Sequence, residues 1–244
     1  MSLETHGFRL STVRAPDALG VAGQLSFEIL DSHGEVVTEY TESHEKDLHL
    51  IVVRTDGAEF AHVHPELGPD GSWTIPWTWE RAGSYRVFAD LIPAGEEEAI
   101  TLTRTVEVAG ELSPTPPQRE SLRARVDGYD VQLEGELHVG ATSVLTLSVT
   151  QNGAPVTRIE PYLGAFGHLV ALRDGDLAYL HVHPEGTEPA PGAVSGPKVE
   201  FATAAPTAGL YLLYFDFQID GVVHSAPFII QATAGEPSTA GDSH

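Results

Sequence analysis

The chain of 244 residues contains no cysteine and a single methionine, Met1. The absence of cysteine excludes disulfide bonds, thiolate metal sites and a blue-copper centre. The lack of any other methionine also excludes a thioether site for Cu(I). No apolar run approaches the length that spans a bilayer, and no segment keeps a 3.6-residue apolar period. The sequence therefore predicts neither a transmembrane segment nor a helical fold.

Basic residues are also scarce, because 13 Lys and Arg stand against 35 Asp and Glu, for a formal net charge of -22. Nucleic-acid binding depends on phosphate neutralisation by Lys and Arg, so this balance argues against a nucleic-acid partner. An acidic surface raises the local concentration of cations, although solubility or a salty habitat explains the same balance. The first residues, MSLETHGFRLS, show no signal peptide. We therefore expect either a cytoplasmic protein or a mature form.

A proline-rich stretch at residues 113–119 divides the chain nearly in half and favours an extended, semi-rigid spacer. We expect one domain on each side, residues 1–112 and 120–234, and a disordered tail over residues 235–244. The halves align with an offset of 119 residues, which becomes 126 past an insertion in the second half. A repeat of about 120 residues is far longer than a solenoid unit. It indicates the duplication of a whole domain.

Each half consists of short runs rich in Val, Leu, Thr and aromatic residues, separated by Gly, Asp, Asn and Pro. In the first half the expected strands are Gln24–Leu30, Leu48–Arg54, Phe60–His64, Ser84–Leu91 and Ile100–Val108. In the second half they are Ser143–Thr150, His168–Arg173, Ala178–His183, Leu210–Gln218 and Ala226–Gln231. The pattern predicts an all-β protein of two tandem antiparallel β-sandwiches, immunoglobulin-like or cupredoxin-like, with about seven strands each.

The most specific feature is a histidine followed thirteen residues later by His-Val-His-Pro, which occurs once in each half. The two sets are His49, His62 and His64, and His168, His181 and His183. One His-x-His on a strand is common, but the same three-histidine spacing in both halves favours a duplicated metal site. The alternative is that the histidines are structural and bind no metal.

The spacing has a geometric reason. If Arg54 pairs with Glu59 across a four-residue loop, His49 lies directly opposite His64, and His62 lies diagonally on the same face. Directly opposed Cβ atoms are about 4.5–5.5 Å apart and diagonal ones about 7–8 Å, so the imidazoles can share an ion.

The second copy repeats this arithmetic, with His168 opposite His183 and His181 beside it. Both faces of the first hairpin carry apolar residues: Ile51 shares the face of the histidines, while Leu50 lies on the other. The sequence therefore leaves open which face packs into the core.

Three neutral imidazoles suit Zn(II), Cu(II) or Ni(II) and leave one coordination position open. Asp90 and Asp216 are candidates for an additional ligand, because the repeat keeps each in a Tyr-x-x-x-x-Asp pattern on a late strand. His44, five residues before His49, is a candidate in the first half alone, since its counterpart is Leu163.

Two paired stretches, His44–Arg54 with Phe60–Pro65 and Pro161–Arg173 with Leu180–Pro184, resemble a family of largely uncharacterised actinobacterial proteins described as secreted or heavy-metal-associated. The similarity extends over nearly all of residues 7–232. It implies an extracytoplasmic location and a link to copper or other metals. Members of that family usually begin with a signal or membrane anchor, which we do not find in this sequence.

We therefore expect a protein that binds copper(II) or zinc(II) at one three-histidine site per domain. Its role would be sequestration, buffering or delivery outside the cytoplasm, with a second metal-handling protein as a candidate partner. No catalytic residue is assigned. One alternative is a metal-dependent hydrolase that uses the open coordination position. The other is a metal-free tandem immunoglobulin-like interaction module.

Overall fold

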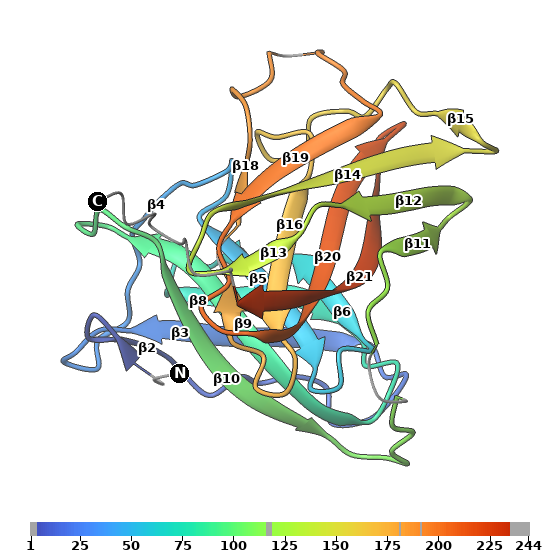
Figure 1. Ribbon diagram of the computed structural model, residues 1–244. Helices are drawn as coiled ribbons and strands as arrows, with labels where there is room; N and C mark the ends of the chain where they lie inside the picture. Colours follow the sequence, from blue (N-terminus) through green and yellow to red (C-terminus); the bar gives the residue numbers. More distant parts are fainter. Residues whose placement is uncertain (1–3, 116–118, 181, 191, 235–244) are drawn as a thin grey trace, which may run out of the picture. The chain divides into compact units, whose positions relative to one another are not determined.

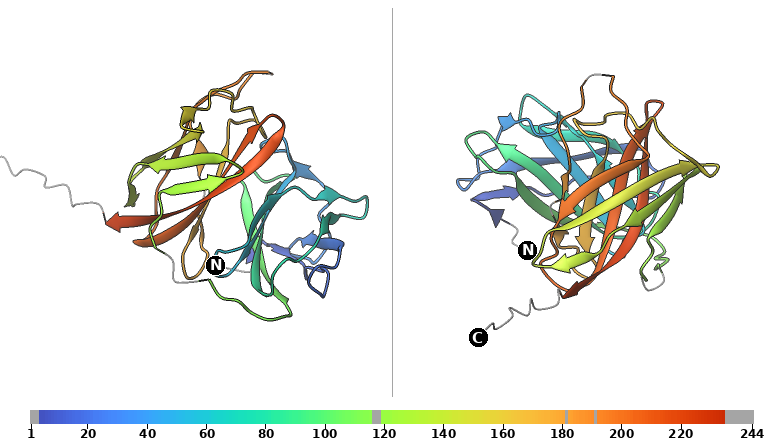
Figure 2. Two further views of the ribbon diagram at one scale, coloured as in Figure 1. Left: turned by 90° about the vertical axis from the view of Figure 1, so that its right-hand side faces the viewer. Right: turned by 45° about the horizontal axis from the view of Figure 1, so that its top comes forward.

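The computed structural model describes residues 4–115, 119–180, 182–190 and 192–234, with the backbone alone of His183. Residue contacts divide the chain into two compact units, Met1–Pro117 with Gly175–Leu177, and Gln118–Asp174 with Ala178–His244. Every regular element of the described residues is a β-strand (Figures 1 and 2). In this part of the chain no helix is long and apolar enough to cross a membrane.

The N-terminal unit consists of two sheets. One has the order β1-β2-β3-β8-β7 and the other the order β10-β9-β5-β6, with β4 paired to β9. The strands are β1 (Glu4–Thr5), β2 (Phe8–Leu10), β3 (Gly23–Leu30), β4 (Tyr40–Thr41), β5 (Leu48–Arg54), β6 (Phe60–Val63), β7 (Glu66–Leu67), β8 (Ser72–Trp77), β9 (Gly83–Pro93) and β10 (Ile100–Val108).

The core of this unit lies between its two sheets. Leu25, Phe27 and Ile29 alternate along β3, and they belong to the same buried cluster as Leu50 and Val52 of β5. Because side chains alternate across a strand, the odd-numbered residues of β5 face away from this core. This alternation decides on which face the histidines lie.

The C-terminal unit also consists of two sheets, β11-β12-β14-β19-β18 with β15 paired to β14, and β13-β21-β20-β16-β17. The strands are β11 (Arg123–Val126), β12 (Tyr129–Glu134), β13 (Leu137–Val139), β14 (Ser143–Gln151), β15 (Ala154–Pro155), β16 (His168–Arg173), β17 (Tyr179–Leu180), β18 (His183–Pro184), β19 (Lys198–Thr203), β20 (Gly209–Ile219) and β21 (Val222–Ala234).

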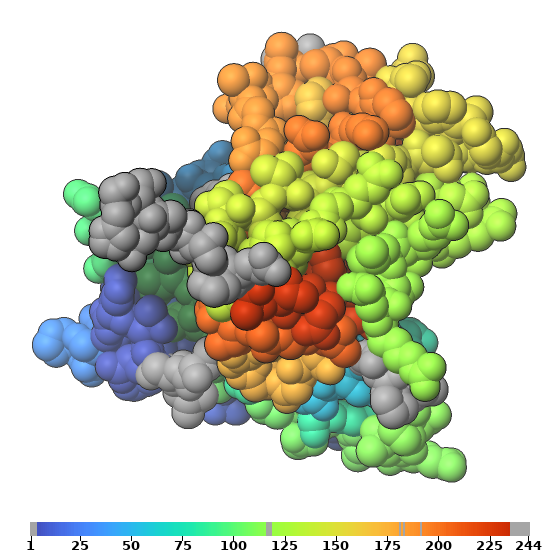
Figure 3. Space-filling model, in the orientation of Figure 1, coloured from blue at the N-terminus to red at the C-terminus, as the bar shows by residue number. Residues whose placement is uncertain are grey.

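The first sheet of the C-terminal unit is apolar inside and polar outside. Along β12, Tyr129, Val131 and Leu133 are buried in the core cluster, and the residues between them point outward. In Figure 3 the green to yellow residues of the β12 and β14 region form a continuous surface. The clean alternation is typical of an antiparallel sheet with one solvated face.

The two units repeat one strand order. β3-β8-β7 corresponds to β14-β19-β18, and β10-β9-β5-β6 corresponds to β21-β20-β16-β17. The predicted fold class, two antiparallel β-sandwiches related by duplication, is confirmed.

Most of the expected strands are present within one or two residues of their predicted ends, although β21 begins four residues earlier than expected. The expectation of one strand over residues 178–183 is wrong. Tyr179 and Leu180 pair with β16, Val182 lies in no strand, and the backbone of His183 pairs instead with Ala202 of β19. The chain leaves one sheet for the other within three residues. The expected tail, residues 235–244, and residues 116–118 of the expected spacer lie outside the described residues.

Candidate metal centre

The hairpin of β5 and β6 has the predicted register. The Arg54 backbone N–H donates to the Glu59 carbonyl at 2.8 Å, which closes the four-residue loop. The pairs along β6 keep this register. It places His49 opposite His64 and His62 diagonally across from His49. The thirteen-residue spacing is therefore the distance along the chain from one strand, around the loop, to the facing strand.

The three histidines lie on the face of this hairpin that is turned away from the core. Leu50 and Val52 pack in the core cluster, so their neighbour His49 points to the opposite side of β5. His49 is 9% exposed, whereas His62 and His64 are half-buried. The site thus has one buried imidazole, from His49, and two partly exposed imidazoles, from His62 and His64.

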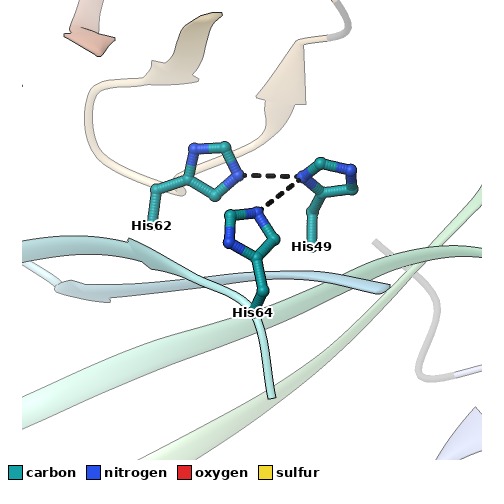
Figure 4. A group of neighbouring side chains, drawn as sticks. All are labelled: His49, His62 and His64. Atoms are coloured by element: carbon teal, nitrogen blue, oxygen red, sulfur yellow. Dashed lines mark hydrogen bonds between the residues drawn. The ribbon is translucent and has the colours of Figure 1, made fainter. Parts of the chain in front are cut away.

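The three rings converge on one point, as Figure 4 shows. Nε2 of His62 lies 3.2 Å from Nδ1 of His49, and Nε2 of His64 lies 3.1 Å from the same atom. One ligand nitrogen from each of the three rings lies within 4.8 Å of the other two. Zinc–nitrogen bonds of about 2.0–2.1 Å in a tetrahedron separate two ligand nitrogens by about 3.3 Å. Both contacts at Nδ1 of His49 are close to this separation.

A backbone carbonyl fixes the tautomer of His49. Nε2 of His49 lies 3.0 Å from the carbonyl oxygen of Ser43, which can only accept a hydrogen bond. The proton of a neutral ring must therefore sit on Nε2, and the lone pair sits on Nδ1, toward His62 and His64. One lone pair cannot accept two well-aligned hydrogen bonds, whereas one cation can be shared by three imidazole lone pairs. Metal-binding histidines commonly donate their other N–H to a carbonyl in this way.

The remaining candidates of the first half lie near the site but outside the group of three nitrogens. Asp90 is paired with His49 across β9 and β5, and its Oδ1 accepts a hydrogen bond from Thr101 Oγ1 at 3.0 Å. His44 is exposed, and its ring centroid lies 6.2 Å from that of His49. Among the described residues, the group whose ligand atoms gather within 4.8 Å is made of imidazoles alone.

The C-terminal unit reproduces the surroundings of the first histidine. Nε2 of His168 lies 2.8 Å from the Tyr162 carbonyl oxygen, and His168 is paired with Asp216 across β16 and β20. Burial raises the pKa of Tyr162, and the charge of Asp216 raises it further. His181 lies outside the described residues, and of His183 only the backbone is described. Of the second set of candidate ligands, the structure therefore describes the side chain of His168 alone.

An ion pair holds the hairpin that carries the first site. Arg54, whose side chain is 2% exposed, donates from Nε and Nη2 to both carboxylate oxygens of Asp56 at 2.7 Å. Its Nη2 also donates to the Ser113 carbonyl and the Thr115 hydroxyl, both at 3.2 Å. Burial alone would raise the pKa of Asp56, but the hydrogen bonds from Arg54 and Thr115 outweigh it and hold the pKa well below its usual range. The start of the predicted spacer is thereby fastened to the N-terminal unit.

The carbonyl oxygens of Ser43 and Tyr162 were not predicted from the sequence. A backbone acceptor has no residue-type signature, so no motif pointed to it. Repetition is a usable signal, because the two residues are 119 positions apart and each begins a tight turn six residues before its histidine.

A family model with the description "Domain of unknown function (DUF8832)" matches two segments, residues 5–109 and 124–234. These two segments correspond to the two sandwiches. No curated protein matches the chain.

Solved structures that match the chain share little sequence with it. The D0-D1 domain of intimin is 12% identical, with 93% of this chain and 95% of that chain covered at a TM-score of 0.23. Invasin, a bacterial integrin-binding protein, is 12% identical, with 93% of this chain and 39% of the invasin chain covered, at a TM-score of 0.26. A putative membrane anchored protein from Corynebacterium diphtheriae is 11% identical, with 97% of this chain and 60% of that chain covered, at a TM-score of 0.26.

Proposed function

This chain belongs to the family described as a domain of unknown function (DUF8832), and we propose that it binds a divalent transition metal, copper(II) or zinc(II), through three histidines in each domain. The ligands of the first centre are His49 through Nδ1, and His62 and His64 through Nε2. The observation that carries the proposal is the pair of contacts of 3.2 Å and 3.1 Å at a Nδ1 atom whose lone pair is fixed by a carbonyl.

The same carbonyl contact in the C-terminal unit supports a second centre. His168 has its Nε2 bound to Tyr162 just as His49 has its Nε2 bound to Ser43. The ligands of this second centre are then His168 through Nδ1, together with His181 and His183.

The partial exposure of His62 and His64 favours a metal that exchanges over one that is held permanently. His62 and His64 are half-buried, and the core of the unit packs on the opposite face of β5. The metal therefore adds little to the core, and we expect the apo protein to be folded. A folded apo form with an accessible site suits sequestration, buffering or delivery. The resemblance to secreted and heavy-metal-associated proteins favours a location outside the cytoplasm.

Calorimetric titration of untagged apo protein with Cu(II) and Zn(II) tests the proposal. We expect about two equivalents to bind to the unaltered protein, since one site forms in each domain. The variants His62→Ala/His64→Ala and His181→Ala/His183→Ala should each lose one equivalent. A control with His6→Ala/His33→Ala removes two histidines that lie outside the candidate ligand sets. Binding that is equally weak in all four proteins would leave the histidines as structural residues of an interaction module.

The same untagged protein, loaded with zinc, also tests the hydrolase alternative. The zinc-loaded protein would have to hydrolyse simple esters, and the activity would have to disappear in His62→Ala/His64→Ala.

A further inference from the structure

We propose that His44 is a fourth imidazole ligand of the N-terminal centre, which makes Cu(II) the preferred metal of that centre, while the C-terminal centre has three imidazoles. This inference rests on the proposed function. The observation behind it is a turn that is built alike in both units but carries a different side chain beside the first histidine.

The turn in question spans residues 43–46 and is bound directly to the centre. Ser43 and Lys46 exchange two backbone hydrogen bonds, at 2.9 Å and 3.2 Å. The Ser43 carbonyl also accepts the Nε2–H of His49. The turn that holds His44 is thus tied to the ring that a shared metal would bind.

The backbone of this turn is unusual for the residues it contains. His44 and Glu45 have φ of 51° and 61°, in the left-handed region that glycine favours. In the C-terminal unit the same turn is occupied by Leu163 and Gly164, with φ of 53° and 72°. The second copy therefore has a glycine at one of the two positions, whereas the first has none.

The two copies also differ in what the turn presents to solvent. Leu163 is 5% exposed, whereas His44 is exposed. The His44 ring centroid lies 6.2 Å from that of His49, compared with 4.8 Å to 5.4 Å among the three converging rings. The His44 nitrogens lie outside the group of three, so ligation requires the side chain to rotate. Because the side chain is exposed, that rotation disturbs no core packing.

A fourth imidazole favours copper over zinc. Cu(II) prefers a tetragonal arrangement and suits four nitrogen ligands in one plane, whereas Zn(II) is satisfied by three imidazoles and a water in a tetrahedron. Copper also exceeds zinc in intrinsic affinity for nitrogen ligands. His44 should therefore strengthen copper binding more than zinc binding.

Electron paramagnetic resonance of one equivalent of Cu(II) tests this inference in a His181→Ala/His183→Ala background, which isolates the first centre. The parent should show four coordinated nitrogens. His44→Leu, which installs the residue of the second copy, should show three, with at least a tenfold weaker affinity for Cu(II) and less than a threefold change for Zn(II). His44→Asn keeps a residue that tolerates positive φ and should give the same result. His33→Leu makes the same chemical change elsewhere and should alter neither.

The outcomes distinguish a failure of the His44 inference from a failure of the three-histidine centre. Four nitrogens and unchanged copper affinity in both His44 variants would overturn the role of His44 and leave the three-histidine centre standing. An equal loss of copper and zinc affinity would also overturn it, since that pattern reports a disturbed turn. Absence of binding that depends on His62 and His64 would instead overturn the proposed function itself.

Discussion

Replacing Asp56 by asparagine should destabilise the N-terminal unit. Asp56 lies in the loop between β5 and β6, and it is the anionic partner of the buried Arg54 guanidinium. Removal of one partner of a buried ion pair costs about 3–5 kcal/mol, because it leaves a charge unpaired in the interior. Asp56 is 28% exposed, and asparagine retains one acceptor oxygen, so we expect a cost of about 2–3 kcal/mol.

The pH dependence of this cost provides a second readout. The folded pKa of Asp56 is depressed, so the pair stabilises the protein above the unfolded pKa of about 3.9 and loses that contribution as the pH falls toward the folded pKa. The difference in unfolding free energy between the native protein and Asp56→Asn should therefore be full at pH 7 and shrink below about pH 4.

Urea denaturation of the two proteins, followed by tryptophan fluorescence, measures this difference. All three tryptophans, Trp73, Trp77 and Trp79, lie in the N-terminal half, so the signal reports this unit. With a slope of about 1–3 kcal/mol/M, the midpoint at pH 7 should fall by about 0.7–3 M. Asp70→Asn, at an exposed turn, is the matched control and should shift it by much less. A cost below about 0.5 kcal/mol for Asp56→Asn, or a cost that persists unchanged in acid, would refute the reasoning.

Further predictions concern Tyr40, Gly167 and the binding of copper. Burial raises the pKa of Tyr40 to about 12, so an ultraviolet titration of the seven tyrosines should contain one step near that value that is absent from Tyr40→Phe; an unchanged titration would contradict the assignment. The same variant removes the Tyr40 hydroxyl, which accepts a hydrogen bond of 3.2 Å from Trp73 Nε1. Urea denaturation should show an unfolding free energy lower by about 1 kcal/mol. Gly167→Ala should cost about 1–3 kcal/mol, because a Cβ there would lie 2.5 Å from Cε2 of Phe215, and an unchanged urea midpoint would refute the clash. Copper(II) at a hundredfold excess over its dissociation constant should raise the unfolding free energy of the N-terminal unit, followed by tryptophan fluorescence, by about 2.7 kcal/mol. A rise of that unit's stability that survives in His62→Ala/His64→Ala would contradict the assignment of these ligands.

The register of the first hairpin could be predicted because its loop is short. A four-residue loop between Arg54 and Glu59 fixes which residues face each other, and the side-chain period of two fixes that His62 and His64 share a face. The spacing of the histidines therefore contained the arrangement that the structure shows.

The face that carries the histidines could not be predicted, because both faces of β5 are apolar. Leu50 and Val52 on one side and Ile51 and Val53 on the other have similar hydrophobicity, and every residue of β5 is buried. Only the packing against the partner sheet, through residues such as Leu25 and Phe27, distinguishes the sides.

The prediction for the end of the second hairpin was wrong for a different reason. Residues 178–183 have the composition of one strand, yet Leu180 pairs with β16 while the backbone of His183 pairs with β19, so the chain crosses from one sheet to the other. Such a crossing depends on which sheet offers a free edge, and this information is not local in sequence.

X-ray absorption of the zinc-loaded protein in the His181→Ala/His183→Ala background is the most direct test of the first centre. Our account predicts three imidazole nitrogens at about 2.0–2.1 Å with the outer-shell scattering of the rings. That signal should disappear when His62 and His64 are also replaced by alanine. A shell of oxygen atoms without imidazole scattering, unchanged by those substitutions, would show that the converging histidines are not a metal centre.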